Sequence, residues 1–480
     1  MKLSDTLKFF SIVLAILAAL CLIFPSDGIR IGGTTLRFAK MHDVLVREKQ
    51  KSIDELLVHE ETRDLTGIMD SLSECRHYLF ESQTRFWLPN DDVSLLDSFF
   101  SKASRAESMN RVVRVLHYGD SQIELDRISC QLRERLQELF GGSGPGLLPL
   151  RQPIPTYTFS QHASGNLIGQ STWGDSTFVR AKGNYGPMLR SWRINGNATM
   201  NLSATKNKNA PARVGQFSSI RLLFNNRPGP LSVTMRDRKG GATFAATNND
   251  EGVAIIEWSL DSVTSSATLT LNGNTDIYGV LVDGNYGVAV DNISMRGASG
   301  TRFTSVNAEQ LKEAYRLMDV GLIIMQFGGN SVPYLKGEKS INSYCESLGK
   351  QIDFLHQTAP GVPILFIGPS DMSTRVNGRM ATYPCLPEVV QKLRDMANSH
   401  GAAFWSIYDA MGGENSMLSW NSNGLAGADY VHFTPKGAAI MGDYISDALT
   451  RLYELYLLRQ KVGEKQFNEL WNSTSSITTR

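Results

Sequence analysis

Apolar residues recur along the chain in two patterns, and each pattern predicts a different kind of element. Residues 111–118, RVVRVLHY, are mostly β-branched and apolar, which is typical of a buried strand. From Leu125 onward, apolar residues return every three or four positions as far as Phe140, and two glycines follow. This spacing predicts a helix with a glycine stop. The segment therefore reads as a strand, a tight turn and a helix.

The same alternation continues in the second half of the chain. Further apolar strands are predicted at 321–327, 363–368 and 402–407. Helical patterns are predicted around 308–318, 342–357 and 386–399, and again at about 437–460. Strands that alternate with helices indicate an α/β fold with a doubly wound parallel sheet.

A long central segment breaks this rhythm. Residues 155–290 are rich in Thr, Asn and Gly and contain short alternating runs such as SIRLLFN and LSVTMRD. This composition predicts an all-β sandwich inserted into the α/β domain. The resulting domain plan has a helical spacer (26–110), an α/β domain in two pieces (111–154 and 291–460), the β insert (155–290) and a polar tail (461–480).

The first 25 residues have a separate character. Lys2 and Lys8 precede an apolar run from Phe9 to Phe24, whose length lies between that of a signal-peptide core and a short membrane helix. No small-residue cleavage site follows, so an uncleaved signal anchor (1–25) is favoured over a cleaved peptide. Either form would place the rest of the chain in the cell envelope, anchored to the inner membrane with its catalytic domain in the periplasm, or secreted.

Composition narrows the possible functions. A chain of 480 residues predicts two or three domains, and 42% hydrophobic with 20% charged residues describes a globular protein. A net charge of +1 gives no reason to expect a nucleic-acid partner. The five cysteines lack CxxC spacing, so they indicate neither a zinc site nor a disulfide framework.

The tripeptide Gly-Asp-Ser occurs twice, at 119–121 and at 174–176. The first copy follows a predicted strand and precedes a predicted helix, so Ser121 would lie at the carboxyl edge of a parallel sheet, where such folds bind ligands. Its N–H would also begin the helix and favour developing negative charge. The second copy has neither flank and is predicted to be a loop. The alternative for Ser121 is an ordinary capping serine.

A serine nucleophile needs a base and a group that orients the base. Asp429 and His432 stand three residues apart near the C-terminus, a spacing that lets both side chains point the same way on a turn. His117 is nearer to Ser121 in sequence but is predicted to pack within its strand. Two glycine turns offer donors for an oxyanion, one containing Gly297 and one ending in Asn330.

These four blocks, in this order, resemble the SGNH (GDSL-like) hydrolases, which combine GDS, a Gly, a GxN and a DxxH. They stand here at 119–121, 297, 328–330 and 429–432. The resemblance covers roughly residues 110–460. The β insert looks like that of the peptidoglycan O-acetylesterase branch, where it is a jelly roll similar to carbohydrate-binding modules. The GxSxG elbow of α/β-hydrolase lipases is absent.

The resemblance implies a role for each residue. Ser121 would be the nucleophile, His432 the general base and then acid, and Asp429 the group that orients His432. The backbone N–H groups of Ser121 and Gly297, with the Asn330 amide, would form the oxyanion hole. No metal or organic cofactor is implied. Gly300 stays an alternative to Gly297, and Gln122 replaces the usual Leu after the serine.

The predicted function is an exported serine esterase that removes O-acetyl groups from an envelope glycan, with peptidoglycan as the first candidate. The membrane would be a partner through the N-terminal segment. An O-acyltransferase on the same scaffold and a non-catalytic glycan-binding protein remain alternatives. Four aromatic residues of the β segment are candidate sugar contacts, with a place in the sandwich core as the alternative for each: Tyr157, Trp173, Tyr185 and Trp192.

Overall fold

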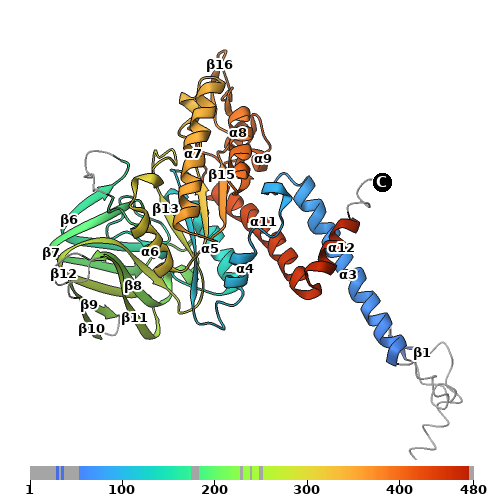
Figure 1. The fold of residues 1–480 in the computed structure, drawn as a ribbon, viewed down its shortest axis with the longest axis horizontal. Coiled ribbons are helices and arrows are strands. Elements are labelled where there is room, and N and C mark those ends of the chain that lie inside the picture. The colour runs from blue at the N-terminus through green and yellow to red at the C-terminus, as the bar shows by residue number, and fades with distance from the viewer. Residues whose placement is uncertain are drawn as a thin grey trace, which may run out of the picture. The chain divides into compact units, whose positions relative to one another are not determined.

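The computed structural model describes residues 29–31, 34–36, 53–174, 183–226, 231–237, 241–247 and 252–474 (Figure 1). The chain divides into two compact units, residues 1–71 and 72–480. In the first unit, β1 (Ile29–Ile31) pairs antiparallel with β2 (Thr34–Leu36), and helix α3 (Ile53–Glu81) begins. The apolar run at 9–24 lies outside the described residues. Within the described ranges, no helix has the length and apolar character that crossing a membrane requires.

The second unit is built around a six-stranded sheet of order β13-β4-β14-β15-β18-β3. Five of its strands are parallel, and only the edge strand β3 is antiparallel. This confirms the predicted parallel sheet. The bounds are β3 (Phe86–Trp87), β4 (Val112–Gly119), β13 (Gly287–Ser294), β14 (Val320–Gln326), β15 (Ile364–Gly368) and β18 (Ala403–Ser406).

Helices cover the sheet in two groups. Helices α4 (Asp97–Ala103), α5 (Arg127–Phe140) and α11 (Pro435–Val462) pack together. Helices α6 (Ala308–Met318), α7 (Glu338–Thr358) and α8 (Leu386–Ser399) form the other group. The remaining elements near the carboxyl edge are short: β16 (Ser373–Val376), β17 (Arg379–Thr382), α9 (Ile407–Met411) and α10 (Ser416–Ser422).

The sheet register brings three chain segments to one point. Gly119, the last residue of β4, lies between Ser294 at the end of β13 and Gln326 at the end of β14. Because parallel strands end at the same edge, the loops that follow them emerge side by side. These loops carry Ser121, Gly297 and Asn330.

An all-β region lies between α5 and β13 in the sequence and beside the α/β part in space (Figure 1). Strand β12 is shared by the whole region, since it pairs with β5, β7, β8 and β9. A separate apolar core fills its interior, with Leu222 and Leu269 among its members. The bounds are β5 (Gly146–Leu148), β6 (Phe159–Ser171), β7 (Arg190–Ala204), β8 (Phe217–Asn226), β9 (Leu231–Asp237), β10 (Ala242–Thr247), β11 (Gly252–Thr264) and β12 (Ser266–Asp283).

The β region and the α/β part share a buried boundary. Buried Arg114 of β4 pairs with Asp283 of β12 and, at 2.7 Å, with Asp291 of β13. Charges removed from water in this way are strongly destabilising when one partner is lost. Leu147 and Tyr278 of the β region also join the core under β4 and β14. The two parts therefore fold against each other as one packed body.

Three details differ from the sequence prediction. The helix after Ser121 begins only at Arg127, because a 3-10 turn with left-handed residues Leu125 and Asp126 intervenes, so the Ser121 N–H does not begin it. The 26–110 segment is not only helical, since β3 completes the sheet edge. The 461–480 tail contains helix α12 (Glu464–Thr474), which buries Phe467 and stacks it on Trp471.

Candidate active site

Ser121, His432 and Asp429 form a continuous hydrogen-bonded line. The Ser121 Oγ lies 2.8 Å from His432 Nε2, and His432 Nδ1 lies 2.8 Å from Asp429 Oδ2. A neutral imidazole whose Nδ1–H donates to the carboxylate presents Nε2 as an acceptor to the serine hydroxyl. This geometry suits a serine nucleophile with a histidine base and an orienting acid.

The three-residue spacing of Asp429 and His432 follows from the turn between them. Asp429 Oδ1 accepts the backbone N–H groups of Val431 and His432, each at 3.0 Å, which leaves Oδ2 for the imidazole. Partial burial alone would raise the pKa of Asp429, but the hydrogen bonds from His432 and Val431 outweigh it and lower that pKa. Asp429 is therefore ionised where it orients the ring.

Asn330 lies across from the serine and is held from two sides. Its Nδ2 donates to Asp120 Oδ2 and to the carbonyl oxygen of Ala298, both at 3.1 Å. The loop after β13 thus contacts the loop after β14 directly. Ser121 and Asn330 both line the pocket at the nucleophile, whereas Gly297 is not among its lining residues.

The two glycines after β13 have different environments. Gly300 packs so tightly that an added Cβ would lie 2.7 Å from the Phe327 ring. Gly297 has φ +75 but meets nothing within 4 Å of an added Cβ. Both glycines adopt left-handed φ values, +75 at Gly297 and +81 at Gly300, but Gly300 is also explained by core packing. Gly297 is the better candidate for the backbone donor.

Asp120 is buried next to the nucleophile and connects two of these loops. Its Oδ1 accepts the Gln122 N–H at 2.9 Å, while Oδ2 accepts from Asn330. Burial raises the pKa of Asp120 to about 6, although the Gln122 N–H acts in the opposite direction. The aspartate of the GDS tripeptide thus braces Asn330 as well as its own turn.

Two side chains that were not predicted as site residues brace the His432 loop. Gln122 Nε2 donates to the Val431 carbonyl at 2.6 Å, and the Phe433 N–H donates to Gln122 Oε1 at 3.3 Å. Arg127 donates to the Ser121 carbonyl at 2.5 Å and to the Phe433 carbonyl at 2.9 Å. The Gln at position 122, where the family usually has Leu, was the feature of the sequence that could have indicated this role. Nothing in the local pattern marks Arg127.

A small pocket of about 170 Å³ opens at Ser121. Its walls include Asn330, Tyr334, Met372 and His432. Its volume is below the roughly 300–1,000 Å³ of drug-sized ligand sites. A pocket of this size matches a short acyl group better than a long one.

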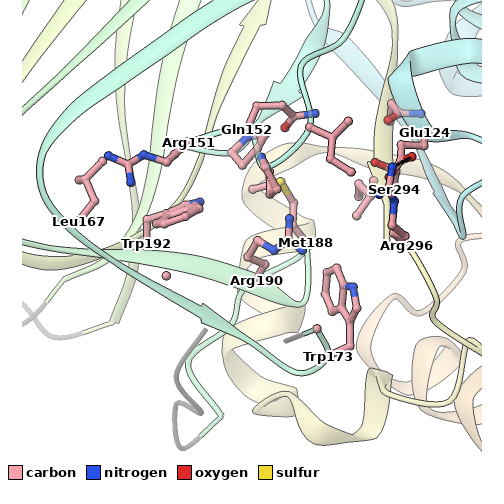
Figure 2. A pocket seen from close by; sticks show the side chains of 17 residues that line it. Glu124, Arg151, Gln152, Leu167, Trp173, Met188, Arg190, Trp192, Ser294 and Arg296 are labelled. Carbon is pink, nitrogen blue, oxygen red and sulfur yellow. Dashed lines mark hydrogen bonds and ion pairs between the residues drawn. The ribbon is translucent and has the colours of Figure 1, made fainter. Parts of the chain in front are cut away.

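A larger pocket of about 630 Å³ lies where the β region meets the α/β part. Figure 2 shows Trp173 and Trp192 in its wall, with Glu124 and Arg296 opposite Arg151. Two of the four predicted sugar contacts thus line a pocket. Tyr185 does not, because it is buried in the main core. Tyr157 also lies outside this pocket lining.

His117 and the second Gly-Asp-Ser copy have no visible part in the site. His117 is buried in β4, where it contacts Ser129 Oγ at 2.9 Å and Gln326 Oε1 at 3.0 Å, and burial lowers its pKa to about 4. It is a packed histidine, as predicted. Gly174 lines the larger pocket, while residues 175–176 lie outside the described part of the chain.

Comparisons with known proteins agree with this architecture. The model of the GDSL-like Lipase/Acylhydrolase family matches residues 261–440, which include Gly297, Asn330, Asp429 and His432. No curated protein sequence matches the chain. A solved structure described as "Peptidoglycan O-acetylesterase in action, 5 min" is 19% identical with a TM-score of 0.59, covering 75% of this chain and 97% of that one.

A family two carbohydrate esterase from Cellvibrio japonicus is 9% identical and covers 62% of this chain and 99% of that one, with a TM-score of 0.25. That score is too low to establish a common fold. The match with a TM-score of 0.59 shows a shared fold over 75% of this chain at 19% identity. The family-model match over residues 261–440 and this shared fold support a carboxylic ester hydrolase of the SGNH (GDSL-like) type.

Proposed function

We propose that this esterase removes O-acetyl groups from a cell-envelope glycan, and that the glycan is peptidoglycan. The observation that carries the proposal is the line from Ser121 through His432 to Asp429 at the mouth of a pocket of about 170 Å³. A serine site of this size accepts a short acyl group, and a larger polar pocket next to it has room for sugar units.

Acylation follows from the distances in the site. The Ser121 oxygen attacks the carbonyl carbon of the acetyl ester while His432 Nε2, 2.8 Å away, takes the hydroxyl proton. Negative charge then develops on the carbonyl oxygen. The N–H groups of Ser121 and Gly297 and the Asn330 amide are the donors proposed to meet it. The bond to the sugar oxygen breaks, and His432 returns the proton to that oxygen.

Deacylation uses the same groups with water. His432 removes a proton from a water molecule, which attacks the acetyl-serine, and acetate leaves as the serine regains its proton. The His432 side chain is 36% exposed and that of Asp429 53%, so water reaches the base directly. This exposure favours hydrolysis over transfer to a second sugar, although an acceptor hydroxyl would use the same path.

Peptidoglycan is proposed because the solved structure with the same fold bears the name of a peptidoglycan O-acetylesterase. Two tryptophans and three arginines in the larger pocket add polar and aromatic surface of the kind that sugars contact. The apolar run at 9–24 is the basis for proposing export, which would bring the enzyme to the cell wall.

The test is acetate release from O-acetylated peptidoglycan by residues 26–480, measured beside hydrolysis of 4-nitrophenyl acetate. We expect release by the wild type, a loss on the order of 10⁴-fold or more for Ser121→Ala, and no loss for Ser176→Ala in the second Gly-Asp-Ser copy. Cleavage of 4-nitrophenyl acetate without release from peptidoglycan would retain the serine chemistry and refute the proposed glycan. Transfer of acetyl to an added oligosaccharide in place of acetate release would refute hydrolysis.

A further inference from the structure

The larger pocket begins beside the nucleophile. Glu124, in its wall, donates its backbone N–H to the Ser121 carbonyl at 3.3 Å. Ser294, also in the wall, pairs with Gly119 at the end of β4. Two residues of its wall therefore lie beside the turn and the strand end that carry Ser121, and a substrate that extends from Ser121 along them would enter this pocket.

Two arginine–tryptophan pairs form the wall on the β side. The Arg151 guanidinium lies 5.7 Å from the centre of the Trp192 ring, and that of Arg190 lies 4.5 Å from the centre of the Trp173 ring. Arg151 lies in the segment that follows β5, whereas Trp192 lies in β7 and is almost fully buried. Stacking on an indole holds a guanidinium flat and leaves its in-plane N–H groups at the edges.

The charges in the pocket are unbalanced. Among the residues that the structure describes, its wall contains three arginines and one carboxylate, Glu124 (Figure 2). Glu124 is engaged by Arg296 through two bonds of 2.8 and 2.5 Å. Arg151 has no hydrogen bond or ion pair to any residue that the structure describes. The charges of Glu124 and Arg296 thus cancel on one side of the pocket, whereas on the other side Arg151, next to Trp192, keeps a positive charge.

We infer that this pocket binds a carboxylate of the glycan, with Arg151 as its contact, and so selects acidic glycan strands. The inference rests on the proposed glycan esterase function and adds the class of substrate. Arginine is the side chain best suited to a carboxylate, because its planar donors match the two oxygens. The Trp192 ring lies within cation–π range of the guanidinium, and the volume of about 630 Å³ accommodates a sugar unit with its substituents.

The test compares two preparations of O-acetylated peptidoglycan strands, one intact and one with its carboxylates converted to amides. Amidation removes the charge and nearly keeps the size. For each, kcat/KM for acetate release is divided by kcat/KM for 4-nitrophenyl acetate, which does not reach the pocket. We expect this ratio to be at least about tenfold higher for intact strands with the wild-type enzyme. This arm needs no variant, so misfolding cannot affect it.

The second arm uses Arg151→Gln, with Arg236→Gln as the matched control. Arg236 is exposed on β9 of the same region and does not line the pocket. We expect the ratio on intact strands to fall at least about tenfold for Arg151→Gln and to stay unchanged for the control. For Arg151→Lys, which keeps the charge but loses the planar pair of donors, the ratio should fall less. Strands freed of their peptides distinguish a carboxylate on the sugar from one on a peptide.

Three outcomes would overturn the inference. Equal ratios for intact and amidated strands would show that charge is not recognised. An unchanged ratio for Arg151→Gln would remove Arg151 as the contact, and an equal fall on both strands would make it a contact to neutral groups. Failure of the wild type to release acetate from either strand, with 4-nitrophenyl acetate still cleaved, would instead refute the proposed glycan function itself.

Discussion

The pocket at Ser121 and the larger pocket lined by Glu124 and Arg151 are built in different ways. The small one is enclosed by loops that follow the parallel strands, and its polar groups are held by short bonds such as those from Gln122 and Asp120. The larger one is walled mainly by the β region, and its polar groups are long side chains such as Arg151 and Arg296. The pocket at Ser121 is small and its polar groups are fixed by hydrogen bonds, whereas the larger pocket is wide and has an excess of arginines.

This contrast indicates a division of labour. Catalytic donors must be in place before charge develops, because their contribution depends on preorganisation. Binding groups for an extended ligand tolerate more freedom, since they contribute affinity and selection. Changes in the small pocket should therefore reduce the rate on every substrate. Changes in the larger pocket should alter the preference among substrates.

The largest effect after loss of the nucleophile is expected for Asn330→Ala. Loss of one oxyanion donor costs about a hundredfold to a thousandfold in kcat. The loss should be similar for 4-nitrophenyl acetate and for the glycan, because both pass through the same oxyanion. Steady-state kinetics on the two substrates measure it, with Asn195→Ala, an exposed residue of β7, as the control. A loss confined to the glycan would place Asn330 in substrate binding.

A smaller loss is expected for Gln122→Ala. The variant removes both bonds that hold the residues on either side of His432, at Val431 and Phe433. Displacement of a catalytic group by about 1 Å costs up to a hundredfold, so kcat should fall about tenfold to a hundredfold on both substrates. Gln122→Glu retains the acceptor for the Phe433 N–H and should retain more activity than Gln122→Ala. Equal activity of Gln122→Ala and wild type would show that the loop is held without it.

The parallel sheet and the four motif blocks could be predicted because each is a local pattern. Buried parallel strands such as 320–326 are continuous apolar runs, and the blocks that follow them lie where strand ends converge. The turn after Ser121 could not be predicted. Its acidic residues, Glu124 and Asp126, are buried by pairing with Arg296 and Arg133, and such pairs depend on the folded chain.

The β region was less predictable in its details. Alternating residues indicate strands but do not show which aromatic side chains face the core. Tyr185 is buried in the main core, while Trp173 reaches the pocket wall, and both stand in similar sequence surroundings. Strand β3 is only two residues long, too short for any periodicity to mark it. Tertiary contacts decide both cases.

The contrast between the pockets also predicts selectivity on the acyl side. The small pocket holds an acetyl group, so 4-nitrophenyl acetate should be hydrolysed with a kcat/KM at least about tenfold higher than 4-nitrophenyl octanoate. Met372→Ala enlarges the small pocket and should lower the ratio of the two kcat/KM values. Arg151→Gln, in the larger pocket, should leave that ratio unchanged. A higher kcat/KM for the octanoate would show that the small pocket does not limit the length of the acyl chain.

The smallest expected effect concerns stability at Asp120, the charged residue most deeply placed in the small pocket. Burial raises the pKa of Asp120 to about 6 from its ordinary value of 3.8, so between these pH values the folded protein holds a proton there that the unfolded chain has released. Stability contributed by this site is therefore lost as the pH rises from about 4 to about 6, by up to about 1.4 kcal/mol per pH unit. Asp120→Asn cannot ionise and avoids that loss.

Denaturant unfolding of wild type and Asp120→Asn at several pH values tests this reasoning. The two should be about equally stable near pH 4, and the variant should gain about 1–2 kcal/mol above pH 6. The same exchange at exposed Asp261 should show no such trend. A constant difference at all pH values would mean that the bonds to Asn330 and Gln122, rather than the buried charge, decide the effect. A gain for the variant confined to pH values above about 6 would show that Asp120 costs stability while it holds the turn of the nucleophile and the Asn330 amide in place.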